Sequence, residues 1–83
     1  MKILYFAWLK SKIGADEEEV SQPAGVSTVS ALIDWLVARG PRFADAFEHR
    51  EVIHVAINQR YAHPGDPVGP DDEVAFFPPI AGG

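Results

Sequence analysis

The chain has 83 residues, of which 47% are hydrophobic and 23% charged, the composition of one small globular domain. Twelve acidic residues against seven basic ones give a net charge of −5, the wrong sign for neutralising the phosphates of a nucleic acid. The absence of cysteine excludes disulfide scaffolds, thiol nucleophiles and zinc sites built on thiolates. The longest apolar run, Ile3 to Leu9, is too short to span a membrane, so we expect no membrane partner and a cytoplasmic location.

The first quarter of the chain predicts two strands. Segment Lys2–Trp8 is apolar and aromatic on both faces, which is typical of a strand at the centre of a sheet. Gly14 marks a turn within the segment 10–16. The polar segment Glu17–Gln22 is then expected to pair back onto the first strand as an edge strand.

One apolar stripe with helical spacing predicts the main helix, formed by Val29, Leu32, Ile33, Leu36 and Val37. Ser27 or Thr28 supplies the N-cap oxygen. Gly40 is expected at the C′ position, and Pro41 prevents the helix from continuing. The same proline can open a second, shorter helix over residues 42–48.

The second half of the chain predicts three further strands. A β-branched run, Val52–Ile57, is followed by a tight turn at Asn58–Gln59 and a brief strand, Arg60–Ala62. Residues 63–72 are rich in proline and glycine and predict a loop. The last strand is expected at Glu73–Phe77.

This order of elements predicts an α+β fold, with about five strands in a mixed sheet, one main helix and a short second helix. The first and last strands are the most apolar, so we expect them side by side at the centre and parallel, joined by a right-handed crossover. That arrangement is the β-grasp, or ubiquitin-like, roll. We expect one domain over residues 1–77 and an extended tail over residues 78–83.

The side chains offer little for catalysis or metal binding. The spacing of His49, His54 and His63 matches no metal-binding pattern, and His54 fits a place on the surface of the sheet. The acidic runs lack the alternating oxygens and central glycine of a calcium loop, and the sequence contains no phosphate-binding loop or nucleophile elbow. We therefore expect this chain itself to bind no metal or cofactor.

The end of the sequence is the remaining feature with chemical potential. Phe76 and Phe77 anchor the last strand, and Pro78 and Pro79 then fix φ and offer no amide hydrogens to a sheet. At roughly 3.3 Å per residue, the six residues that end in Gly83 reach about 20 Å when fully extended. A stiff, narrow tail that ends in two glycines suits insertion of a terminal carboxylate into a partner's buried site.

The carboxylate of Gly83 is the reactive group that this geometry suggests. A carboxylate is a poor electrophile, so it needs activation by ATP to an acyl adenylate on another enzyme. A sulfur donor then converts the activated terminus to a thiocarboxylate. Because the chain has no cysteine, a carried sulfur has to sit on the main-chain terminus.

The segment Asp72–Gly83 resembles the terminal signature of the small subunits of molybdopterin synthases, which are ubiquitin-like sulfur carriers. The similarity extends to the opening strand Ile3–Ala7, to the helix over residues 28–36 and to the strand and turn at Val55–Gln59. The resemblance implies a β-grasp fold and a chain that is not catalytic alone.

The resemblance also implies two protein partners. An adenylating enzyme, using ATP and magnesium, activates Gly83 and allows its conversion to the thiocarboxylate. The large synthase subunit, in an assembly with two copies of each subunit, accepts the tail, and the sulfur passes to a cyclic pyranopterin phosphate to build the dithiolene of molybdopterin. Gly82 and Gly83 are then the reactive end, and the implied partner-binding residues are Phe76, Phe77, Pro78, Pro79, Ile80 and Ala81.

Three alternatives stay open from the sequence. A related carrier for thiamine or another sulfur-containing product shares the fold and the two glycines, but is expected to lack the run Phe76–Pro79. A ubiquitin-like protein modifier is joined through Gly83 to lysines of its targets. An adaptor binds through an exposed face of the sheet, and its tail has no role.

Overall fold

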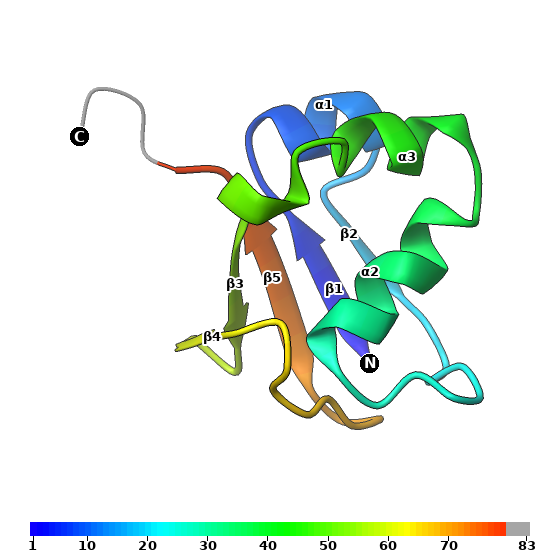
Figure 1. The fold of residues 1–83 in the computed structure, drawn as a ribbon, viewed down its shortest axis with the longest axis vertical. Helices are drawn as coiled ribbons and strands as arrows, with labels where there is room; N and C mark the ends of the chain where they lie inside the picture. Colours follow the sequence, from blue (N-terminus) through cyan, green and yellow to red (C-terminus); the bar gives the residue numbers. More distant parts are fainter. Residues whose placement is uncertain (80–83) are drawn as a thin grey trace.

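A five-stranded mixed sheet forms one layer of the molecule, and α2 covers one of its faces (Figure 1). The computed structural model describes residues 1–79. Within this part the strand order is β2-β1-β5-β3-β4. The elements in chain order are β1 (Lys2–Tyr5), α1 (Trp8–Ile13), β2 (Glu17–Glu19), α2 (Val29–Val37), α3 (Pro41–Ala46), the 3₁₀ helix η1 (Arg50–Val52), β3 (His54–Ile57), β4 (Arg60–Ala62) and β5 (Glu73–Phe77).

The two central strands, β1 and β5, run parallel, with Ile3 opposite Val74 and Tyr5 opposite Phe76. All other strand pairs are antiparallel. The β-grasp arrangement expected from the sequence is therefore confirmed, including the neighbouring first and last strands.

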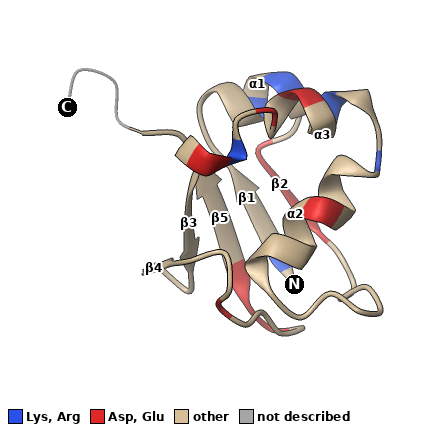
Figure 2. Ribbon diagram, in the orientation of Figure 1, with Lys and Arg blue, Asp and Glu red and all other residues tan. Residues whose placement is uncertain are grey.

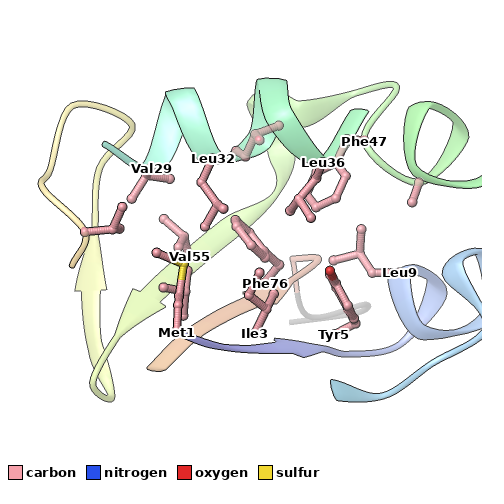
Figure 3. Packing of buried hydrophobic residues seen from close by; sticks show 14 of the residues in the cluster. Met1, Ile3, Tyr5, Leu9, Val29, Leu32, Leu36, Phe47, Val55 and Phe76 are labelled. Carbon is pink, nitrogen blue, oxygen red and sulfur yellow. The ribbon is translucent and has the colours of Figure 1, made fainter. Parts of the chain in front are cut away.

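Successive side chains of β1 and β5 point to opposite faces of the sheet, and those on the α2 side form the core. The side chains at its centre come from β1, β5 and α2, and none is more than 1% exposed: Ile3, Tyr5, Val74, Phe76, Leu32 and Leu36. Figure 3 shows the helix side chains pointing toward those of the strands, with Phe76 between the two layers. The ring of Phe47, just after α3, meets the ring of Phe76 edge to face with centroids 5.2 Å apart.

The main helix begins where predicted, but it ends earlier than predicted. The side chain of Thr28 caps α2 by accepting a hydrogen bond from the amide of Ala31 at 3.2 Å. The helix ends at a right-handed C-cap, Ala38, so the prediction of Gly40 at C′ is wrong. Gly40, with a φ of 149°, is instead the residue before Pro41 at the start of α3.

The short helix α1 was absent from the sequence prediction, which placed a strand up to Trp8 and a turn after it. Two buried residues one turn apart, Leu9 and Ile13, attach α1 to the core, and Gly14 ends it with a φ of 87°. Six residues are too few for a helical period to stand out against the preceding aromatic strand. Within residues 1–79, no helix has the length and hydrophobicity needed to cross a bilayer.

Three strands are shorter than predicted. β1 ends at Tyr5 and β2 at Glu19, and the 3₁₀ turn η1 takes up Val52, where the third strand was expected to begin. β1 ends early because the chain turns at Ala7, with a φ of 53°, and enters α1, and the other two differences lie at element ends.

The turn between β3 and β4 lies at Asn58 and Gln59, as predicted. Both residues have left-handed φ values, 52° and 69°, which is the backbone of a type I′ turn. The side chain of Asn58 also links the turn to β5: its Nδ2 donates to Asp72 Oδ1 at 2.9 Å, and its Oδ1 accepts from the amide of Glu73 at 3.0 Å.

Replacing Gln59 with glycine is expected to raise the free energy of unfolding by about 0.5–1 kcal/mol, because a side chain in left-handed backbone costs roughly 1–2 kcal/mol and glycine's larger entropy loss on folding returns part of it. The matched change Asn58→Gly is expected to lower the free energy of unfolding, since it removes two hydrogen bonds. Urea denaturation of both variants tests the pair. A gain in stability for both would show that the Asn58 hydrogen bonds contribute less than the backbone strain that glycine relieves there.

A buried phenol is connected to the surface by one carboxylate. The Tyr5 hydroxyl donates to Glu18 Oε2 at 2.7 Å, and Arg39 Nη1 donates to the other oxygen of Glu18 at 2.8 Å. The guanidinium of Arg39 also lies over the rings of Trp35 and Phe43, 5.0 and 4.7 Å from their centroids. This network joins β1 and β2 to the end of α2 and to α3.

Burial, with the hydrogen bond to Glu18 as a second cause, raises the pKa of Tyr5 well above its usual range. Above about pH 10 the unfolded chain therefore loses the phenolic proton while the folded chain keeps it, and stability falls as pH rises. We expect the free energy of unfolding to fall less steeply in this range for Tyr5→Phe than for the native protein. Tyr61→Phe, which alters a side chain that is 78% exposed, is the control and should leave the slope unchanged.

Candidate functional site

The face of the sheet opposite α2 carries side chains in three rows that cross the strands. The middle row follows the strand pairing and consists of Glu17 at the β2 edge and then Leu4, Ala75, Ala56 and Tyr61. At the carboxyl end of β5, Phe77 is paired with His54. The row at the opposite end is charged and consists of Glu19, Lys2 and Glu73. Figure 2 shows the same division, since β5 is charged only at its beginning and β3 carries no charge.

A mainly apolar groove of about 790 Å³ lies on this face, which we call the outer face. The small side chains of Ala56 and Ala75 in the middle row leave space for the groove. Pro78 and Pro79, at the start of the tail, also line it. The groove is lined by Leu4, Phe6, Ala7, Trp8, Ala56, Gln59, Glu73, Ala75, Phe77, Pro78 and Pro79.

Two large apolar side chains on the groove are exposed to solvent. Phe6 is 49% exposed and Trp8 is 40% exposed, on either side of the corner between β1 and α1. The chain turns this corner at Ala7, which has a φ of 53°. Exposed aromatic side chains that gather around an apolar groove are typical of a protein-binding surface.

Three rings form a cluster where β5 ends, next to the groove. The rings of His54 and Phe77 are stacked, with centroids 5.7 Å apart and an angle of 24° between their planes. Tyr61 lies 5.9 Å from Phe77 and 6.5 Å from His54, measured between centroids. We call these three residues the aromatic cluster.

The opposite end of the outer face is acidic. Lys2 Nζ lies 3.2 Å from Glu17 Oε2, and this hydrogen-bonded carboxylate raises the pKa of Lys2. Glu17 and Glu19 are exposed on β2, the edge strand of the sheet. Charged side chains on an edge strand discourage pairing with the strand of another molecule. The apolar surface therefore continues toward the tail rather than toward β2.

Within residues 1–79, no three histidine or acidic side chains come close enough together to hold a metal ion.

The model of a protein family described as the ThiS family matches residues 3–83 of the chain. The chain belongs to the ThiS family. The molybdopterin synthase sulfur carrier subunit of Escherichia coli (strain K12) is 39% identical over 83 residues, covering all of this chain and 99% of that protein. The protein of the same name from Haemophilus influenzae is 34% identical, with the same coverage. Among solved structures, SAMP1 from Haloferax volcanii matches with a TM-score of 0.76 and 30% identity, covering 100% of this chain and 98% of that one.

The family expected from the sequence is thus confirmed. Some of the predicted site residues of this ThiS-family chain lie on the groove, and others do not. Phe77, Pro78 and Pro79 line the groove. Phe76 does not: its side chain is 0% exposed, because alternation along β5 directs it into the core. Its predicted contact with a partner is corrected to packing that holds the start of the tail. Residues 80–83, which include the predicted site residues Ile80, Ala81, Gly82 and Gly83, lie outside the described residues.

The sequence prediction missed the part of the outer face that lies outside β5 and the tail, at the corner between β1 and α1 and on β3 and β4. Phe6, Trp8 and Tyr61 are exposed on this face, and His54 belongs to it as a member of the aromatic cluster. One signal was present in the sequence: the opening strand is apolar on both faces, although α2 covers only one. The predicted place of His54 on the sheet surface is confirmed.

Proposed function

We propose that this chain is the sulfur carrier subunit of a molybdopterin synthase. The observation that carries the proposal is the match to the ThiS family and to the named sulfur carrier subunits, which extends over the whole chain and includes its diglycine end. The apolar groove supports the proposal, because Pro78 and Pro79 line it and thereby connect a protein-binding face with the reactive terminus. The cytoplasmic location expected from the sequence is part of the same proposal.

The proposed chemistry takes place on the carboxylate of Gly83. Attack of this carboxylate on the α-phosphate of ATP gives an acyl adenylate and pyrophosphate, on an adenylating enzyme that uses ATP with magnesium. A reduced sulfur donor then attacks the carbonyl carbon, AMP leaves, and a thiocarboxylate remains. The sulfur passes to a cyclic pyranopterin phosphate in the large subunit, and after two such transfers the dithiolene of molybdopterin is complete.

The chain's own residues supply binding and positioning in this proposal. The side chain of Phe76 is buried in the core, and its carbonyl accepts a hydrogen bond from the amide of Phe6 at 3.1 Å. Core packing and the sheet hydrogen bond together fix the position at which the tail begins. Pro78 and Pro79 then lack the amide hydrogens needed to extend the sheet. The groove and the aromatic cluster bind an apolar surface of the large subunit, in an assembly with two copies of each subunit.

Intact-mass measurement tests the proposal. The protein is incubated with ATP, magnesium, a matching adenylating enzyme and a sulfur source. We expect a mass gain equal to the replacement of one oxygen by sulfur. Mixing the loaded protein with the large subunit and cyclic pyranopterin phosphate should then give the dithiolene. No mass change with an adenylating enzyme of proven activity would contradict the proposal.

The likeness to SAMP1 favours one second candidate, because a further structure of the Haloferax volcanii protein names it small archaeal modifier protein 1. In that case Gly83 forms an amide bond with a lysine of another protein, and water is lost overall. Incubating the tagged protein with ATP, the adenylating enzyme and extract from its own source distinguishes the two candidates. Bands that resist reducing agent and boiling would support modification, whereas a thiocarboxylate without such bands supports sulfur transfer alone.

A further inference from the structure

The aromatic cluster contains two titratable side chains, the imidazole of His54 and the phenol of Tyr61. His54 is exposed at the first position of β3, and its ring is stacked on Phe77, the last residue of β5. The groove next to this cluster is lined by Phe77, Pro78 and Pro79. A partner that receives the tail therefore has to pass over or beside the imidazole.

The charged and titratable groups around His54 come from two other segments. Arg50 and Glu51 of η1 and His63 of the loop after β4 line a second cleft, together with His54. Arg50 is occupied, since its Nη1 donates to Asp34 at 2.7 Å and its Nη2 to the carbonyl of Ser30 at 3.1 Å.

Glu51 is the carboxylate of that cleft, and its Oε1 lies 3.7 Å from His49 Nδ1. From β4 and β5, the groups that face the imidazole are the neutral rings of Tyr61 and Phe77. Among the described residues, none forms an ion pair with His54, so water would solvate the charge of its imidazolium form.

We propose that His54 is a docking residue of the outer face and that it binds the large subunit in its neutral form, which makes docking sensitive to pH. The inference rests on the proposed function, because that function supplies the occupant of the groove. A neutral imidazole stacked on Phe77 can be covered by an apolar surface as another aromatic ring would be. An imidazolium covered in the same way loses its water and gains no counter-ion, which is costly.

Binding of the large subunit to the neutral form alone has a direct consequence for the proton balance. The complex therefore binds fewer protons than the separate proteins. It follows that affinity falls as pH falls through the range in which histidine titrates, by at most about tenfold per pH unit for one proton.

The test compares the native protein with His54→Phe, which keeps an aromatic ring and removes the proton. The dissociation constant with the large subunit is measured for both at intervals between pH 8 and pH 5.5. For the native protein we expect weakening of roughly tenfold beyond that of the variant over this range, because the variant reports all pH effects of the partner. A second variant, His54→Leu, should behave like His54→Phe.

Two further histidines provide matched controls. His49→Gln and His63→Gln should keep the native pH dependence, because neither side chain is part of the aromatic cluster. In NMR titrations, the His54 ring should take up its proton at lower pH in the complex than in the free protein.

The experiment distinguishes failure of the proposed role of His54 from failure of the proposed function. Parallel pH profiles for the native protein and His54→Phe would overturn the role of His54 and leave the proposed function intact. The absence of any binding by the native protein at pH 8 would overturn the proposed function, and the role of His54 with it.

Discussion

Adding one residue after Gly83 is expected to abolish loading with sulfur and to leave the melting temperature almost unchanged. The added residue converts the reactive carboxylate to an amide and moves the new carboxylate about 3.5 Å further along the chain. Activation in a fitted site tolerates little displacement, since errors of about 1 Å can cost on the order of 100-fold in rate. Among residues 1–79 the last member of the hydrophobic core is Phe76, so we expect the added residue to leave the core intact.

The measurement is the mass gain after incubation with ATP, the adenylating enzyme and a sulfur source, together with a thermal melt. Ala81→Ser is the matched control, because it alters the tail and keeps its length and terminal carboxylate. Loading of the extended protein at the native rate would contradict a reactive terminus at Gly83. A fall of many degrees in melting temperature would contradict a tail outside the core.

Two adjacent phenylalanines should give opposite results when each is replaced by alanine. Phe76→Ala is expected to lower the free energy of unfolding by about 3–5 kcal/mol, the cost of deleting a fully buried ring and leaving a cavity. The side chain is 0% exposed, and its ring contacts those of Tyr5 and Phe47. Small domains have only about 5–15 kcal/mol of total stability, so much of it would be lost.

Phe77→Ala should leave the protein folded, with a loss of about 1 kcal/mol from the stacked and tilted pairs with His54 and Tyr61. Binding to the large subunit should weaken by about tenfold or more, because aromatic anchors carry much of the affinity of an interface. Denaturant unfolding and binding measurements on both variants separate the two roles. Equal stability of the two variants would contradict the assignment of Phe76 to the core and Phe77 to the outer face.

Much of the fold follows from local patterns that the sequence displays. The spacing of Val29, Leu32, Ile33 and Leu36 defines α2, and the strong apolar character of β1 and β5 correctly placed both strands at the centre. Helix α1 could not be predicted in the same way. It has two buried residues, Leu9 and Ile13, and these stabilise the helix through tertiary contacts with the core.

The site was predictable only in part, for a related reason. The tail is a continuous segment, and its prolines and glycines act through local backbone properties. The groove combines apolar residues from three strands, Leu4, Ala75 and Ala56, which become neighbours only through the strand register. A histidine among aliphatic residues likewise gives no sign in the sequence that it will stack on Phe77.

The central position of β5 has a consequence for how the protein is made. β5 comes after every other strand in the chain, yet it pairs with both β1 and β3. Without residues 73–77, the sheet would separate into two hairpins, β1–β2 and β3–β4, and two-stranded hairpins are marginally stable alone. Folding therefore waits for the segment that leads directly into the tail. A nascent or prematurely ended chain that stops before β5 would be unfolded and so open to degradation, so only chains made through residue 77 have the complete sheet.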